Sequence, residues 1–306
     1  MDGVLNLNKP IGPTSHDMVA RLRRITGEKR IGHTGTLDPG ASGVMVICLG
    51  KATRIVEYLT EWKKRYRAEV VFGKDTDTED ASGTVTQVRE CSNLILSDIE
   101  RVLPAFIGDI MQIPPMMSAI HHKGKRLYEL ARAGEIVERE PRPVTIHSIE
   151  LLDFQPGDDP RAILDVECSK GTYIRTLCSD IGKALGCGAH MGSLLRTSVG
   201  GFTLDSAVTL DDVECHASDG TIMDILVGIN DAIDTMPAII VSEDDASKIA
   251  NGVKLDAGGL FDKATFQSDA PVRIIDAAGS LIAIGRFVSN DGCPMILKPD
   301  KVFAEL

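Results

Sequence analysis

The strongest constraint on the fold is an aperiodic glycine-rich segment that runs directly into an apolar one. Residues 32–43 read GHTGTLDPGASG and contain four glycines and one proline. Glycine permits backbone angles that other residues avoid, so this stretch predicts a loop of special geometry. Residues 44–49 (VMVICL) are all apolar, which predicts a buried strand. The chain is therefore expected to place a shaped loop immediately before a buried strand.

Strand and helix signals alternate irregularly through the first 235 residues, which favours a mixed α+β domain. Alternating or continuous apolar patterns predict strands, and apolar residues at helical spacing predict helices. The expected strands are 4–9, 44–49, 66–72, 144–154 and 162–168, and the expected helices are 18–26, 126–133 and 173–185. After Pro237 the pattern changes to short strands and one helix at 243–250. We therefore place a domain boundary near residue 235.

The charge is distributed unevenly along the chain. Its formal net charge is −11, but residues 202–306 contain 18 acidic and 7 basic residues, whereas residues 1–70 contain 12 basic and 7 acidic ones. Local clusters set the field that a partner meets, so an anionic partner of the first half is permitted.

The seven cysteines are scattered and form no C-x-x-C pair, which argues against a disulfide framework and a cysteine zinc site. No stretch has the length and apolarity of a membrane span, and the N-terminus lacks the pattern of a secretory signal. These features predict a cytoplasmic protein with reduced thiols and no membrane association.

Common ligand-binding motifs are absent or have the wrong spacing. There is no Walker A loop, and the glycines at 186–192 follow a helix with spacing unlike a dinucleotide fingerprint. Residues 75–80 (DTDTED) have the spacing of the start of a calcium loop but carry Asp80 where that loop needs glycine. We interpret this stretch as a polar turn.

Asp38 is the remaining candidate for chemistry, because it is the single carboxylate in the glycine-rich loop. An aspartate before a proline is most often a turn former. A lone carboxylate cannot supply paired acid–base chemistry, but it can act as a nucleophile when it stays ionised. The residues alone leave both interpretations open.

Six motifs in the order found in one enzyme family extend the argument. They are GVLNLNKP at 3–10, GHTGTLDP at 32–39, KRYR at 64–67, QIPP at 112–115, KRLYELAR at 125–132 and KGTYIR at 170–175. Together they resemble the tRNA pseudouridine synthase B (TruB) family over roughly residues 3–200. The resemblance implies a pseudouridine synthase fold with a mixed, mainly antiparallel sheet.

The resemblance also implies the reaction, which is the isomerisation of uridine to pseudouridine at position 55 in the TΨC loop of tRNA. The target base is flipped out of the RNA, its glycosidic bond is broken, and the sugar is rejoined at C5. The family uses no metal or organic cofactor. The implied partner is tRNA alone, so we expect a monomer without an obligate protein partner.

The resemblance assigns roles to individual residues of this chain. Asp38 would be the essential nucleophile or base, Arg175 its ion-pair partner, and Tyr66 the aromatic residue that stacks on the flipped base. Substrate-binding positions are implied for His33, Tyr173, Leu195, Lys9, Arg126 and Arg132. Core packing stays an alternative for Tyr66, Tyr173 and Leu195, as does a backbone-bonded loop histidine for His33.

Two further regions carry expectations from the resemblance. Residues 112–142 correspond to a thumb-like insertion that closes over RNA, although Met117 and His121 depart from the family pattern. Residues 1–235 would be the catalytic domain, and 236–306 would be a small, β-rich, PUA-like RNA-binding domain. The acidity of that domain argues against a large phosphate contact. The alternatives are a small contact with the tRNA acceptor stem, for example through Lys298 and Lys301, and a domain that mainly stabilises the fold.

Alternatives of other classes are a non-catalytic tRNA-binding or tRNA-folding protein and a guide-RNA-dependent pseudouridine synthase. An intact set of Asp38, Tyr66 and Arg175 argues against a protein that only binds. The thumb-like stretch favours an enzyme that acts without a guide.

Overall fold

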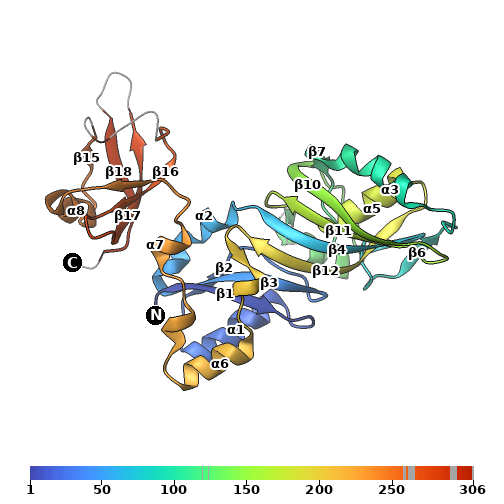
Figure 1. Ribbon diagram of the computed structural model, residues 1–306, viewed down its shortest axis with the longest axis horizontal. Coiled ribbons are helices and arrows are strands. Elements are labelled where there is room, and N and C mark those ends of the chain that lie inside the picture. Colours follow the sequence, from blue (N-terminus) through green and yellow to red (C-terminus); the bar gives the residue numbers. More distant parts are fainter. Residues whose placement is uncertain (119, 123, 258–259, 261–265, 290–294, 305–306) are drawn as a thin grey trace.

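The computed structural model describes residues 1–118, 120–122, 124–257, 260, 266–289 and 295–304. Two sheets organise this part of the chain (Figure 1). The larger has nine strands and the smaller five. No helix among the described residues has the length and apolarity needed to cross a membrane.

The large sheet has seven strands in one path and two short strands that pair beside it. In spatial order the path is β1 (Gly3–Lys9), β3 (Ala41–Leu49), β12 (Ala189–Val199), β4 (Lys64–Phe72), β11 (Arg161–Cys168), β10 (Arg142–Gln155) and β7 (Gly108–Gln112). The short strand β2 (Ile31–His33) pairs with β3, and β13 (Phe202–Thr203) pairs with β12.

Every ladder of the large sheet is antiparallel except β3–β12. The expectation of a mixed, mainly antiparallel sheet is therefore confirmed. The parallel ladder brings the strand that follows the glycine-rich loop beside a strand from much later in the chain, in the register Gly43↔Arg196.

Helices cover the large sheet at its two ends (Figure 1). Helix α1 (Ser15–Thr26) lies with α6 (Leu210–Ser218) beneath the β1–β3 end, and α3 (Leu96–Val102) and α5 (Ile174–Ala184) lie at the other. The apolar face of α1 buries Met18, Val19 and Leu22 in a cluster with β1 and β3. A second cluster packs α5 on β4, β11 and β12. Burial of these two faces is the main force that holds the sheet together.

The shorter elements complete the catalogue of secondary structure. The helices are α2 (Val56–Thr60), α4 (Leu127–Arg132), α7 (Ile229–Ala232) and α8 (Glu243–Ala250), and the 3-10 turns are Gly50–Ile55, Leu103–Phe106, Leu204–Ser206 and Ile222–Ile225. Two hairpins pair β5 (Lys74–Thr76) with β6 (Val85–Val88) and β8 (His121–His122) with β9 (Lys125–Arg126).

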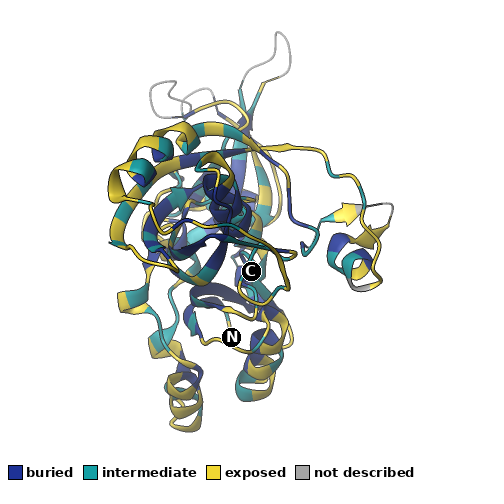
Figure 2. Cartoon of the chain, turned by 90° about the vertical axis from the view of Figure 1, so that its right-hand side faces the viewer, coloured by how far each residue is buried: buried dark blue, intermediate teal, exposed yellow. Residues whose placement is uncertain are grey.

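The segment between β7 and β10 leaves the large sheet and rejoins it beside the residue at which it left. Gln112 pairs with Arg142, and the chain between them forms the β8–β9 hairpin and α4. This segment extends from the body of the molecule (Figure 2).

The small sheet lies in the last 70 residues and has its own apolar cluster. Its order is β14 (Ala238–Ile240), β16 (Pro271–Ile275), β17 (Leu281–Val288), β18 (Ile296–Val302) and β15 (Leu255–Asp256). The expected small β-rich C-terminal part is thus present.

The last strand of the small sheet binds the first half of the chain. Lys301 on β18 forms an ion pair with Glu57 and donates a hydrogen bond to the carbonyl of Arg54 at 2.6 Å. Lys301 therefore ties the small sheet to α2 and the turn before it. This contact fits the expected alternative in which the C-terminal part stabilises the fold, and an RNA contact of the small sheet stays a prediction.

Candidate active site

The glycine-rich loop between β2 and β3 presents Asp38 and is fixed by the N-terminal segment. Ser15 Oγ accepts a hydrogen bond from the Leu37 amide (2.9 Å) and donates one to the Leu37 carbonyl (3.0 Å). The Gly12 amide donates to the carbonyl of Pro39 at 2.8 Å. These bonds hold the backbone on both sides of Asp38 against the start of α1.

Asp38 and Arg175 form an ion pair with 3.0 Å between Oδ2 and Nη2. Arg175 lies in the first turn of α5, and its side chain is 7% exposed, compared with 43% for Asp38. The buried arginine thus holds a carboxylate that faces open space. The sequence predicted this pair, and the geometry brings the two side chains together.

Arg175 makes three further contacts that the sequence did not predict. Its Nη2 donates to the carbonyl of Met117 at 2.9 Å, and its Nη1 lies 3.4 Å from both the Thr78 carbonyl and the Asp80 carboxylate. Asp80 belongs to the turn that resembled a calcium loop. Met117 departs from the family pattern, but Arg175 binds its backbone carbonyl. This contact therefore does not depend on the side chain at position 117.

Hydrogen bonds from residues before and after Asp80 hold its carboxylate within the turn. Asp80 Oδ1 accepts hydrogen bonds from Thr78 Oγ1 (2.8 Å) and from the amide of Ser82 (2.9 Å). The neighbouring Glu79 accepts a 2.6 Å bond from Thr176 on α5. Burial raises the pKa of Glu79, and the Thr176 hydrogen bond opposes that rise. The interpretation as a polar turn was incomplete, since this turn supplies the second carboxylate of Arg175.

A cavity of about 280 Å³ opens beside the Asp38–Arg175 pair. It is lined by residues 34–38 of the loop, residues 169–175, Thr60, Lys64, Tyr66, Met117, Ser118, Leu194 and Arg196. Asp38 is its sole carboxylate among the described residues, and Lys64, Lys170, Arg175 and Arg196 are its cations. The cavity is therefore positive apart from one carboxylate at its exposed side.

Both predicted tyrosines line this cavity. Tyr66 lies on the central strand β4, paired with Val166 and Arg196 in the two neighbouring strands. Burial raises the pKa of the Tyr66 phenol, and the adjacent Arg196 guanidinium opposes that rise by its charge and a hydrogen bond. Burial likewise raises the pKa of Tyr173, while Ser118 and Arg175 oppose the rise.

Gln112 fixes the backbone of Tyr173. Its side-chain amide donates to the Tyr173 carbonyl (2.9 Å) and accepts from the Tyr173 amide (2.8 Å). The QIPP motif was predicted to be irregular, without a role for its glutamine. Gln112 joins the strand before the insertion to the residue before α5.

Leu194, and not Leu195, lines the cavity. Side chains alternate along β12, so Leu194 and Arg196 share the face that looks into the cavity, and Leu195 lies on the other. The expectation for Leu195 is wrong by one residue. Sequence order alone could not decide which member of the Leu-Leu pair faced inward.

Lys9 does not reach the cavity, contrary to expectation. It is fully buried, and its Nζ donates to the carbonyls of Pro10 (2.9 Å) and Ala41 (2.7 Å). Burial lowers its pKa to about 8, with Asp38 raising and Arg196 lowering it. The lysine supports the backbone at the end of the glycine-rich loop.

The other predicted binding residues lie outside the cavity. His33 ends β2 just before the lining residues; burial lowers its pKa, and its Nδ1 has no hydrogen-bond partner. Arg126 is exposed on β9 of the insertion, 5.9 Å from the centre of the Tyr128 ring. The side chain of Arg132 lies outside the part of the chain that the structure describes.

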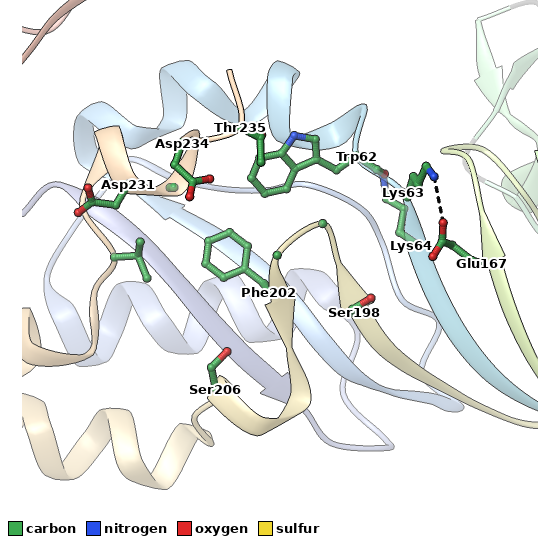
Figure 3. Close-up of a pocket in the computed structure, with 14 residues that line it drawn as sticks. Trp62, Lys63, Lys64, Glu167, Ser198, Phe202, Ser206, Asp231, Asp234 and Thr235 are labelled. Atoms are coloured by element: carbon green, nitrogen blue, oxygen red, sulfur yellow. Dashed lines mark hydrogen bonds and ion pairs between the residues drawn. The ribbon is translucent and has the colours of Figure 1, made fainter. Parts of the chain in front are cut away.

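A second cavity of about 530 Å³ lies beyond Lys64, which lines both (Figure 3). Trp62 and Phe202 stack there with ring centres 6.1 Å apart, and a 3.1 Å ion pair joins Lys63 to Glu167. Asp231 and Asp234 of the segment that leads to the small sheet line its other end. It contains neither Asp38 nor Arg175, so the smaller cavity is the candidate active site.

Comparison with known proteins identifies the family of this chain. The model of the TruB family pseudouridylate synthase N-terminal domain matches residues 23–174, and that of the tRNA pseudouridylate synthase B C-terminal domain matches residues 175–232. The tRNA pseudouridine synthase B of Geobacillus thermodenitrificans is 46% identical over 99% of this chain and 100% of its own. The protein of the same name from Symbiobacterium thermophilum is 50% identical over 83% of each chain.

Solved structures show the same architecture over nearly the whole chain. A chain in the structure titled "Crystal Structure of a Cbf5-Nop10-Gar1 Complex" has a TM-score of 0.76 and 29% identity, covering 99% of this chain and 85% of that one. A chain of an H/ACA RNP bound to a substrate RNA has a TM-score of 0.75 and 27% identity, with the same coverage. With its two family domains and full-length relatives, this chain belongs to the TruB family of pseudouridine synthases.

Proposed function

We propose that this protein isomerises uridine to pseudouridine in tRNA, at position 55 of the TΨC loop, with Asp38 as the catalytic carboxylate. The observation that carries the proposal is the Asp38–Arg175 ion pair at the cavity lined by Tyr66 and Tyr173. The full-length relatives named tRNA pseudouridine synthase B support the same reaction and substrate.

The chemistry requires one bond to break and one to form. The C1′–N1 bond of the target uridine breaks, the uracil turns, and C5 bonds to C1′. The proton on C5 leaves and N1 gains one, so the product is an isomer of the substrate. Asp38 acts either as a nucleophile that captures C1′ or as a base that removes the proton from C2′. Its position at the exposed side of the cavity suits both routes.

Arg175 fixes the catalytic carboxylate in place. Its Nη2 binds Asp38 and the Met117 carbonyl, and its Nη1 lies near Asp80 and the Thr78 carbonyl, so its planar fork is held from several directions. A fixed fork holds the reactive oxygen of Asp38 within the narrow range of positions that an attack on the sugar needs.

The tyrosines account for how a base could leave the RNA. The sugar C1′ and uracil C5 cannot be reached within a stacked loop, so the target must be flipped out, at a cost of a few kcal/mol. Stacking on an aromatic side chain returns about 1–3 kcal/mol per base. Tyr66 and Tyr173, which both line the cavity, are the residues proposed to provide it.

The regions outside the cavity are proposed to hold the rest of the tRNA. The insertion at 112–142, which contains Arg126 and Arg132, is proposed to contact the RNA backbone, and residues 1–235 form the catalytic domain. Residues 236–306 form the PUA-like domain, in which Lys298, 3.9 Å from the Asp300 carboxylate, is proposed to make a small RNA contact. The protein acts in the cytoplasm, as a monomer and without a guide RNA.

The guide-dependent alternative has weaker support. The neighbours from H/ACA assemblies are 27–29% identical to this chain, whereas the curated relatives named tRNA pseudouridine synthase B are 43–50% identical. A protein that only binds tRNA has no need for a carboxylate facing a site that RNA phosphates approach.

The test is pseudouridine formation in an unmodified tRNA transcript, without guide RNA or cofactor, mapped by carbodiimide treatment and primer extension. The wild type should give a stop at position 55, and Asp38→Asn should give none. Asp38→Asn should keep its tRNA dissociation constant within about tenfold, since phosphate and stacking contacts supply most of the affinity. Equal loss of binding and turnover would make Asp38 structural, and tight binding without product by the wild type would favour the binding-protein alternative.

A further inference from the structure

The closed end of the candidate active site holds an arginine with no carboxylate partner. Arg196 is 1% exposed and lines the cavity beside Tyr66 and Leu194. Its Nε donates to the carbonyl of Val44 (2.6 Å) and its Nη2 to that of Gly35 (3.2 Å). In the described part of the chain it forms no ion pair. A buried charge in this situation is costly, and a guanidinium has N–H groups beyond those that bind the two carbonyls and the Tyr66 phenol.

The surrounding charges add to the cost of burying Arg196. Lys64 lines the same cavity, and burial followed by the Arg196 charge lowers the pKa of Lys64 to about 8. Each of the other two cations of the lining has a carboxylate: Arg175 pairs with Asp38, and Lys170 with Glu61. The positive charge at the closed end is thus unbalanced until a ligand enters.

We propose that Arg196 is a catalytic residue that stabilises the negative charge on the uracil after the glycosidic bond breaks. This inference deepens the proposed function and rests on it. When C1′–N1 breaks, the electron pair stays with the ring, and its charge spreads over N1, O2 and O4, while C1′ is left electron-poor. The charge develops on either route open to Asp38, so Arg196 serves both.

The different burial of Asp38 and Arg196 indicates where the uracil ring would lie. C1′ must lie at Asp38, whose side chain is 43% exposed, so the attached base extends inward toward the almost fully buried arginine. Tyr66, the proposed stacking residue, pairs with Arg196 in the β4–β12 register. The phosphates stay with the sugar, on the exposed side where Lys170 lies.

The turn of the uracil explains why an arginine suits this position. Rotation about the axis through N3 and C6 exchanges N1 with C5 and O2 with O4. A guanidinium aimed at one carbonyl oxygen before the turn therefore meets the other one after it. C5 then bonds to C1′, its proton passes to a base, and N1 takes up a proton, which discharges the ring. A preorganised cation that meets charge only as it develops accelerates the step.

The test compares two transcripts, one with uridine at the target position and one with 5-fluorouridine. Fluorine withdraws electrons and makes the detached ring a more stable anion, so its release depends less on Arg196. Under single turnover, loss of the target nucleoside is followed by nuclease digestion and mass spectrometry. Arg196→Gln should slow the uridine transcript by about 100-fold and the fluorinated one by less than about tenfold, with an unchanged dissociation constant.

Three controls separate this role from a structural one. Arg196→Lys keeps the charge and should give an intermediate defect with the same preference for the fluorinated transcript, and it carries the test if Arg196→Gln does not fold. Val44→Ala loosens the core beside the guanidinium, since Val44 is fully buried, and should slow both transcripts equally. Thermal unfolding of each variant shows how far the fold is weakened.

The outcomes are distinct. Equal slowing of both transcripts by the Arg196 variants overturns the proposal. Weaker binding with a shallower salt dependence, and no preference between transcripts, would assign Arg196 to a backbone phosphate instead. If the wild type forms no pseudouridine, the proposed function itself fails, which the uridine transcript alone reveals.

Discussion

Arg175 and Asp38 form a 3.0 Å ion pair in which the arginine is buried and the carboxylate is open to the cavity. The same guanidinium reaches Asp80 on its other side. Its orientation is thus set from within the fold, and the Asp38 carboxylate is held by a group that cannot swing toward solvent. Replacement of any of the three should affect the reaction more than the binding of RNA.

Arg175→Lys should lower the single-turnover rate by about 100-fold, with an unchanged dissociation constant for tRNA, because a single ammonium cannot span two carboxylates and two carbonyls. The measurement is pseudouridine formation with enzyme in excess. Arg161→Lys is the matched control: Arg161 also lies between two carboxylates, Glu69 and Asp159, but outside the cavity. A comparable loss in both variants would contradict a special role for Arg175.

Asp80→Asn should slow the reaction by about tenfold, since the amide keeps the shape but removes the charge that faces Arg175. Asp77→Asn is the matched control. Asp77 lies in the same turn, where it accepts a hydrogen bond from the Thr84 amide and does not touch Arg175. Its rate should stay within about twofold of the wild type. If both variants behave alike, the turn as a whole matters and the Asp80 charge does not.

The buried Lys9 should make stability depend on pH in the alkaline range. Its pKa is about 8 in the folded protein and near 10.5 in the unfolded chain. Below pH 8 both states carry the proton, and the cost of burying the charge is complete. Between pH 8 and 10.5 the unfolded state binds more protons, so the free energy of unfolding rises with pH.

Urea unfolding of the wild type and of Lys9→Met checks this expectation. The difference between them in unfolding free energy should shift in favour of the wild type by up to about 3 kcal/mol from pH 8 to 10.5. Lys29→Met, at an exposed lysine, should show no such shift. A difference that stays flat for Lys9 would mean that its ammonium remains charged and solvated in the fold.

Gly43→Ala should destabilise the protein by at least about 2 kcal/mol, because two independent conditions exclude a side chain there. Its φ is +105°, and a Cβ would collide with the backbone carbonyl of Arg196 across the parallel ladder. Gly40→Ala is the control, since a Cβ at Gly40 meets nothing within 4 Å. Thermal unfolding should separate the two, and equal melting temperatures would contradict the close strand approach.

Most residues of the candidate site could be predicted because they stand in short contiguous motifs. Asp38, Tyr66, Tyr173 and Arg175 each belong to such a motif, and all four line one cavity. Lys9 stands in a motif too, but its buried contacts with Pro10 and Ala41 give it a supporting position instead. A motif therefore predicted which region of the fold a residue occupies better than it predicted which groups that residue contacts.

Asp80 and Arg196 could not be predicted, since nothing near them in the chain marks them. The acidic turn around Asp80 has the composition of an ordinary solvated turn, and it reaches Arg175 only because the β5–β6 hairpin folds back against α5. The choice between Leu194 and Leu195 depended on the alternation of β12 and on its register with β4.

Periodicity and contiguous motifs are encoded in neighbouring residues, so they were enough to predict many of the local elements, the α+β class and the family, but not the central strand β12. The position of β12 between β3 and β4, which sets Arg196 beside Tyr66 on one side and Gly43 on the other, follows only from the folded chain. The folded chain also decides that Arg175 and Lys170 have carboxylate partners, whereas Lys64 and Arg196 line the cavity without one among the described residues. Such relationships arise from strand order and burial, where residues more than a hundred positions apart share one low-dielectric cavity, and no local pattern carries that information.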